Sequence, residues 1–177
     1  MPRDANQATP TPLPRLLWWA LFAGAFGCTE AVVAFYIRRV TGMEPGMDYR
    51  DVWAARGLPF TSSTVEAELR RQRIWTFEQM REVATLLLLV GAALAGGRTG
   101  RERLGLFLFT FAVWDLVYYA FLLITIGFPR SLLDTDIYFL VPFAWYGPVW
   151  FPVLVVMPAL LALSLWLLRR GGPTRPR

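Results

Sequence analysis

Residues 104–127 read LGLFLFTFAVWDLVYYAFLLITIG, an apolar run interrupted by one charged residue, Asp115. A membrane-spanning helix needs roughly 20 consecutive, mainly apolar residues to cross about 30 Å of hydrocarbon. The run meets this length, and a soluble protein of 177 residues could not bury several runs of this kind. It therefore predicts a transmembrane helix that carries a carboxylate near its middle.

Two further apolar runs, residues 16–37 and 149–168, are each about the length of a membrane span. A third, residues 83–97, is too short unless the span begins near Glu78 and covers residues 78–97, which draws Glu78, Arg81 and Glu82 to the membrane edge or inside it. Together with the run around Asp115, they predict an all-α membrane protein with four transmembrane helices. Residues 16–170 are expected to form this single domain. A disordered tail over residues 1–15, rich in proline and polar residues, should precede it, and a tail over residues 171–177 should follow.

Composition agrees with a membrane protein and argues against several kinds of site. Hydrophobic residues make up 55% of the chain, and its 18 basic residues, all arginine, contribute to a net charge of +5. These arginines lie mostly beside the apolar runs, as in helix ends that contact lipid headgroups, so no nucleic-acid partner is expected. The chain has no histidine and a single cysteine, Cys28, so neither an intrachain disulfide nor a metal site built on histidine or thiolate ligands is expected, and no residue is assigned as a metal ligand. No cofactor is indicated.

The segment before the second span predicts a helix that extends beyond the membrane. Ser63-x-x-Glu66 has the spacing of a capping box, and neither proline nor glycine follows until Gly91. One unbroken helix over residues 64–97 would be about 50 Å long. Its first part, rich in arginine and glutamate, would then stand outside the bilayer.

Between the third and fourth spans, residues 128–148 include an apolar stretch that is too short to cross the membrane. This length favours an interfacial or re-entrant segment. Asp134-x-Asp136 could contribute to a metal site, although two carboxylates in a loop are more often simply solvated. Pro152 and Pro158 should bend the fourth span.

Four spans place both termini on the same side of the membrane. Arginines flank the spans on both sides, but those on the terminal side have few acidic neighbours. The positive-inside rule therefore favours cytoplasmic termini.

Ionisable and aromatic side chains from three spans fall into one layer of the predicted bundle. With a rise of 1.5 Å per residue, Asp115 lies ~17 Å from the terminal side, Glu30 ~21 Å and Arg81 ~24 Å. Charged groups at such depth face the bundle interior and pair with one another. The candidate ligand-binding residues in or beside this layer are Glu30, Glu78, Arg81, Glu82, Trp114, Asp115, Tyr118 and Tyr119.

Arg81 is the one cation expected near this depth, and its planar guanidinium can hold one carboxylate, that of Glu30 or Asp115. The remaining carboxylates must be protonated, exposed to water or neutralised by a bound cation. One interpretation is a structural clamp of Arg81 and Asp115, with Glu78 and Glu82 solvated at the interface. The other is a pocket for a cation, a proton or the polar head of a ligand.

Three motifs occur within residues 74–153: Glu78-x-x-Arg81-Glu82-x-Ala84-Thr85, Trp114-Asp115-x-x-Tyr118-Tyr119 and Pro142-x-x-Trp145-x-Gly147-Pro148-Val149. Together they resemble a group of small bacterial polytopic membrane proteins that have no assigned activity. The resemblance implies residence in a bacterial inner membrane, and the arginine-, alanine- and leucine-rich composition is in keeping with a GC-rich bacterium. No catalytic or binding role is carried over from it.

Three functions stay open at this point. The ionisable layer could bind or transport a cation, a proton or a lipid-like ligand within the bilayer. Alternatively, the protein could be a membrane enzyme with a lipid or isoprenoid substrate, in which a carboxylate acts as general acid or base or several carboxylates hold Mg²⁺ or Mn²⁺. The third possibility is a structural or assembly subunit. The sequence names neither a catalytic residue nor an oligomeric state.

Overall fold

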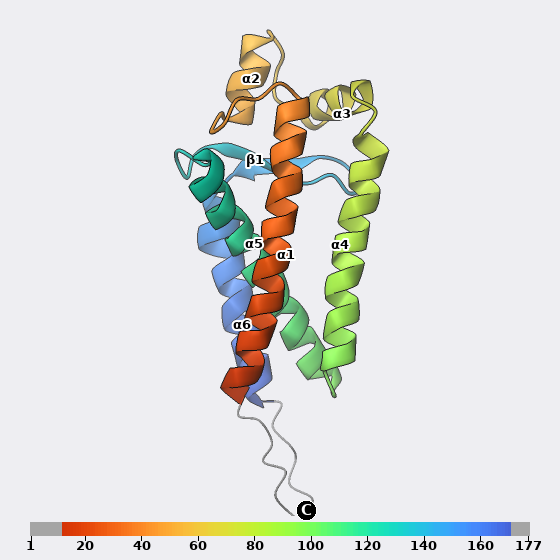
Figure 1. Cartoon of the computed structure of the whole chain (residues 1–177), viewed down its shortest axis with the longest axis vertical. Coiled ribbons are helices and arrows are strands. Elements are labelled where there is room, and N and C mark those ends of the chain that lie inside the picture. The colour runs from red at the N-terminus through yellow and green to blue at the C-terminus, as the bar shows by residue number, and fades with distance from the viewer. Residues whose placement is uncertain (1–11, 171–177) are drawn as a thin grey trace, which may run out of the picture.

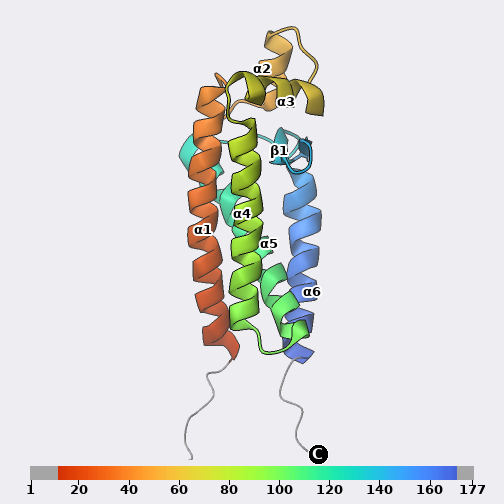
Figure 2. The same cartoon turned by 90° about the vertical axis from the view of Figure 1, so that its right-hand side faces the viewer.

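The computed structural model describes residues 12–170 and confirms the all-α membrane architecture. Four helices are long and apolar enough to cross a membrane, and the first begins at the end of the bundle where the last one ends (Figures 1 and 2). In chain order the elements are α1 (Pro12–Val40), α2 (Tyr49–Ala55), α3 (Ser62–Arg71), α4 (Trp75–Gly96), α5 (Gly100–Ile126), β1 (Thr135–Phe139), β2 (Trp145–Pro148), the π-helix η1 (Phe151–Val156) and α6 (Met157–Arg170).

The ends of the spans differ from the prediction by a few residues. Residues 12–15 were expected in the tail and form the first turn of α1 instead, while residues 1–11 and 171–177 lie outside the described residues. Helix α5 begins after Thr99, whose side chain accepts a hydrogen bond from the amide of Glu102 at 3.2 Å. It ends at Gly127, which adopts the left-handed conformation (φ 67°) that favours glycine.

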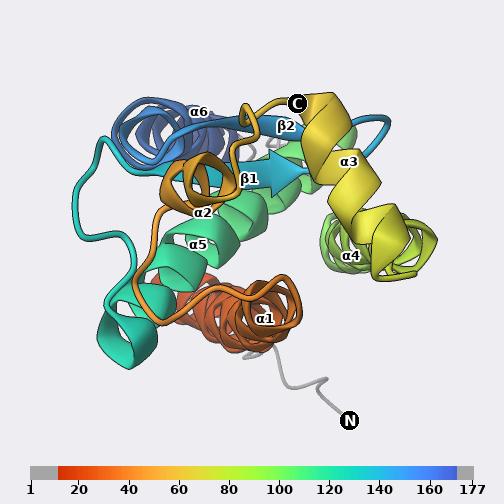
Figure 3. The ribbon, with the colours of Figure 1, turned by 90° about the horizontal axis from the view of Figure 1, so that it is seen from above.

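Helix α5 is the centre of the bundle, because α1, α4 and α6 all pack against it. Seen from above, it crosses diagonally between α1 and α6 (Figure 3). It meets α4 where the short loop joins them and leans away from α4 towards the opposite end (Figures 1 and 3). The contact with α1 is close at Gly27, where a β-carbon would lie 2.5 Å from the carbonyl oxygen of Trp114.

The predicted unbroken helix over residues 64–97 is wrong. Helix α3 ends at Arg71, and α4 begins at Trp75 after a left-handed residue, Arg73 (φ 60°). The amides of Arg73 and Ile74 donate to the carbonyls of Arg70 and Leu69 at 2.9 and 3.0 Å, the Schellman pattern that ends helices. Leu69 and Ile74 join the same apolar cluster, which supplies the hydrophobic contact typical of this motif.

The turn lays α3 across the end of the bundle, instead of extending α4 outward (Figure 3). The start of α3 also differs from the prediction, because its capping box is formed by Thr61 and Thr64 and not by Ser63 and Glu66. We call α2, α3 and the β1–β2 hairpin together the cap. Its apolar cluster includes the fully buried Trp53 and Leu69, and Leu140 and Ala144 of the hairpin connection.

The segment before the fourth span was expected to be interfacial or re-entrant. Within residues 128–148 the structure has an antiparallel hairpin, with Thr135 opposite Pro148 and Ile137 opposite Tyr146. The hairpin lies over the bundle beneath α2 and α3 (Figures 1 and 2). The fourth span then opens with η1, in which the amide of Met157 donates to the carbonyl of Pro152. Pro152 lies in the first turn, where its missing N–H removes no helical hydrogen bond, whereas Pro158, directly after Met157, lacks the N–H that would continue the helix.

Candidate functional site

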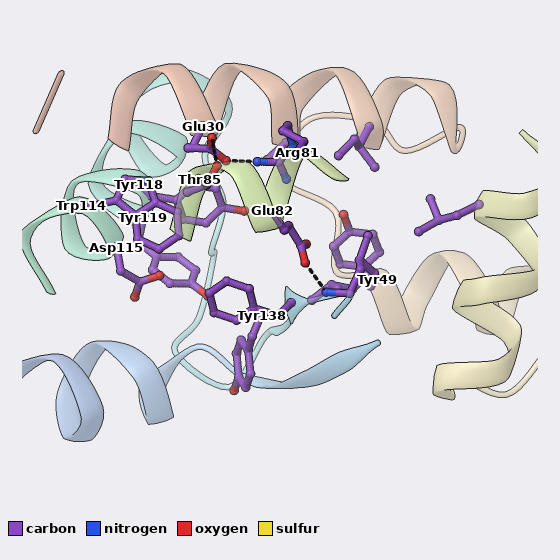
Figure 4. Close-up of a pocket in the computed structure, with 16 residues that line it drawn as sticks. Glu30, Tyr49, Arg81, Glu82, Thr85, Trp114, Asp115, Tyr118, Tyr119 and Tyr138 are labelled. Carbon is purple, nitrogen blue, oxygen red and sulfur yellow. Dashed lines mark hydrogen bonds and ion pairs between the residues drawn. The ribbon is translucent and has the colours of Figure 1, made fainter. Parts of the chain in front are cut away.

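A cavity lies where α1, α4, α5 and β1 meet beneath the cap (Figure 4). Its volume, measured as the space open to the centre of a water-sized sphere, is about 70 Å³. A single water needs roughly 10–15 Å³ by this measure, so the cavity has room for several waters or one small chemical group. Of the candidate residues, all but Glu78 line it: Glu30, Arg81, Glu82, Trp114, Asp115, Tyr118 and Tyr119.

Arg81 and Glu30 form an ion pair along one wall and connect α4 to α1 (Figure 4). The Nε of Arg81 also donates to Glu78, one turn away on α4, at 2.8 Å. The second oxygen of Glu30 accepts from the hydroxyl of Thr85 at 2.8 Å. Every polar atom of the Glu30 carboxylate therefore has a partner, and Arg81 is shared between two glutamates.

Glu82 holds the cap in place. Its Oε2 accepts a hydrogen bond from the backbone amide of Leu140 at 2.7 Å, and the Nε2 of Gln79 donates to the carbonyl of Leu140 at 3.0 Å. Both side chains lie on one face of α4, three residues apart. The expectation that Glu82 would be solvated at the interface, which belonged to the clamp interpretation, is therefore wrong. Glu82 is buried, and it fastens the hairpin to α4.

Asp115 has a different environment from every other carboxylate of the site. Its Oδ2 is buried and has no hydrogen-bond partner among the residues that the structure describes. The ion pair of Arg81 and Asp115, which the clamp interpretation required, does not form, because α5 leans away from α4 and carries Asp115 to the other side of the cavity (Figures 1 and 4).

The indole of Trp114, the preceding residue of α5, carries an unpaired hydrogen-bond donor. Trp114 is 6% exposed, and within residues 12–170 its Nε1 has no hydrogen-bond partner. Buried polar groups in folded proteins nearly always have a partner, so two orphans at one cavity require an explanation. Both residues line the same cavity, so two side chains that each carry an unpaired buried polar atom lie at one space.

A second buried ion pair, which the sequence did not reveal, lies between α1 and the hairpin. Arg38 is 2% exposed and donates to Asp136 (1% exposed) at 3.0 Å and to the carbonyl of Met47 at 3.0 Å. Its guanidinium also lies 3.6 Å from the ring centre of Phe128. Tyr118, expected to flank Asp115, directs its hydroxyl to Asp136 at 3.4 Å.

This pair corrects two expectations. Arg81 is not the only arginine available to buried carboxylates, and Asp136 is not solvated. The cap covers the end of α1, so Arg38 cannot extend to water. Asp134, by contrast, accepts from the amides of Arg130 and Ser131 in an exposed turn. The only sequence signal for the burial of Asp136 is its position directly before the apolar run that starts at Ile137.

Aromatic side chains form much of the remaining wall. The rings of Tyr118 and Tyr119 meet edge to face with centres 5.0 Å apart, and Phe139 and Tyr138 come from β1. Tyr138 lies on the opposite side of the cavity from Glu30 and Arg81 (Figure 4). Burial raises the pKa of Tyr138 and of Tyr49 to about 12. Both phenols are therefore protonated near neutral pH, and that of Tyr138 donates to the carbonyl of Pro148 at 2.7 Å.

The donor set suits a polar organic group better than a metal ion. Among residues 12–170 no group of three or more acidic or cysteine side chains is placed to hold a metal. The residues that line the cavity include instead a carboxylate with one unpaired oxygen, an indole with an unpaired N–H, and aromatic rings. Comparison of the chain with models of protein families, with curated protein sequences and with solved structures finds no match.

Proposed function

We propose that this protein is a binding protein of the membrane that holds a small polar group of a membrane-borne ligand beside Asp115. The observation that carries the proposal is a pair of unsatisfied atoms, Oδ2 of Asp115 and Nε1 of Trp114, on two residues that line one cavity. A buried polar atom without a partner costs about 1–3 kcal/mol. A ligand that supplies both partners recovers this free energy on binding.

The charges around the cavity restrict the chemistry of the ligand. Three carboxylates line the cavity, those of Glu30, Glu82 and Asp115, with one guanidinium, that of Arg81, which is already paired with Glu30 and Glu78. A phosphate or carboxylate head would meet net repulsion here. An ammonium could donate to Asp115 but could not accept from Trp114. A hydroxyl does both, so we infer a ligand with an uncharged hydroxyl-bearing head.

Replacement of Asp115 by asparagine should release the ligand. A hydrogen bond to a charged group contributes roughly 1.5–3 kcal/mol, which corresponds to about a tenfold to hundredfold loss of affinity. Native mass spectrometry of the purified protein measures how much ligand it retains. Asp51→Asn is the matched control, because Asp51 lies exposed in the first turn of α2, away from the cavity. The proposal is wrong if the wild type carries no ligand, or if Asp115→Asn carries as much as Asp51→Asn.

We further propose that the bundle lies in a bacterial inner membrane with the cap on the outer side. The support is the arginine distribution and the common end at which α1 begins and α6 ends (Figure 2). Reporter fusions at Gly100 and after the last residue should both report the cytoplasm, and a fusion at Gly57, in the cap, the periplasm. Opposite signals from Gly100 and the C-terminus would contradict the four-span topology.

A further inference from the structure

A second hollow lies on the outer face of the hairpin. We call it the aromatic groove and define it by the residues that form most of its wall: Phe143, Trp145, Tyr146, Gly147, Pro148 and Phe151. The space open to the centre of a water-sized sphere is about 410 Å³. That size is within the roughly 300–1,000 Å³ of small-molecule sites.

The aromatic groove presents apolar surface at the edge of the membrane span. Phe143, Trp145 and Phe151 are 51%, 50% and 44% exposed. The rings of Phe143 and Trp145 stack with their centres 5.2 Å apart and their planes 6° from parallel. Phe151 is the first residue of η1, so the groove is continuous with the lipid-facing surface of the fourth span. Aromatic side chains at this level commonly contact lipid.

Tyr138 separates the aromatic groove from the cavity, because it lines both. Its hydroxyl donates to the carbonyl of Pro148 in the groove wall at 2.7 Å. A β-carbon on Gly147 would lie 2.6 Å from this hydroxyl, so the glycine leaves the space that the phenol occupies. One side chain thus forms the common wall between a small polar space and a larger apolar one.

The cavity is small and has polar walls, as the head of an amphiphile requires, and the aromatic groove is larger and apolar, as its chain requires. The cavity, at about 70 Å³, admits a head of a few atoms, whereas the groove has about 410 Å³ and mainly aromatic walls. We propose that the ligand is a single-chain amphiphile whose hydroxyl-bearing head lies beside Asp115 and whose apolar chain enters the aromatic groove when Tyr138 turns out of the common wall. This inference rests on the proposed function and names its ligand class.

Photocrosslinking in nanodiscs tests where the chain lies. The probe is a monoacylglycerol with a diazirine in the middle of its chain, and unlabelled 1-monooleoylglycerol is the competitor. We expect competed crosslinks within residues 143–151. Trp145→Ala removes an apolar contact with the chain of the probe and should weaken these crosslinks about tenfold. Trp18→Ala is the matched control, because Trp18 is 71% exposed on α1 near the other end of the bundle.

The same crosslinks should fall about tenfold in Asp115→Asn and stay unchanged in Asp51→Asn, with thermal unfolding confirming that each variant is folded. If the yield of crosslinks in the aromatic groove were the same in Asp115→Asn as in the wild type, the inference would be overturned, because head and chain would then not bind at one site. Competed crosslinks only on lipid-facing helix positions would also overturn it. If retention of 1-monooleoylglycerol still depended on Asp115 in that case, the proposed function would stand without the groove.

Discussion

Replacement of Asp136 by alanine should lower the free energy of unfolding by roughly 3–5 kcal/mol, because it leaves the buried charge of Arg38 without its carboxylate. The side chains of Arg38 and Asp136 are 3% and 2% exposed, so water cannot replace the lost partner. The carbonyl of Met47 and the ring of Phe128 remain, but neither carries a negative charge. Titration with a denaturing detergent measures the loss.

Two variants make this result specific. Asp134→Ala removes a carboxylate two residues away that caps an exposed turn, and it should cost only about 1 kcal/mol. The double change Arg38→Met with Asp136→Leu replaces the ion pair by apolar side chains of similar size and should restore most of the stability. If Asp136→Ala were no more destabilising than Asp134→Ala, the pair would not hold the hairpin on α1.

The four spans could be predicted because the length of an apolar run and the thickness of the membrane are sufficient to identify them. The break between α3 and α4 could not be predicted from the sequence. Helices usually end with glycine in the left-handed position, and here Arg73 occupies it. The turn is stabilised by the packing of Leu69 and Ile74 in the apolar cluster of the cap. This is a tertiary contact, which the local sequence does not encode.

The layer of ionisable residues was also predictable, because the rise per residue fixes the depth of each side chain along its helix. Glu30, Arg81 and Asp115 accordingly line one cavity. The pairing within the layer depends on helix tilt, which hydropathy does not determine. Because α5 leans away from α4, Arg81 pairs with Glu30, the other carboxylate considered for it.

The residues that sequence reasoning missed, Arg38 and Asp136, owe their burial to the cap. An arginine at the end of a span is ordinarily expected to extend to the interface. Here α2 and the hairpin cover that end, and Arg38 has Tyr49 of α2 and Phe128 beside its guanidinium. Nothing in the dipeptide Arg38-Arg39 distinguishes the buried arginine from its exposed neighbour, which pairs with Glu44.

The unfolding free energy of Asp115→Leu, measured with and without ligand, tests most directly whether Asp115 is kept for binding. Without ligand, the variant should be more stable than the wild type by about 1–3 kcal/mol, because leucine removes a buried carboxylate oxygen that has no partner. Addition of 1-monooleoylglycerol should then stabilise the wild type and leave the variant unchanged. A variant that is less stable than the ligand-free wild type would show that Asp115 supports the fold. A variant that the ligand stabilises as much as it stabilises the wild type would show that Asp115 does not bind the ligand.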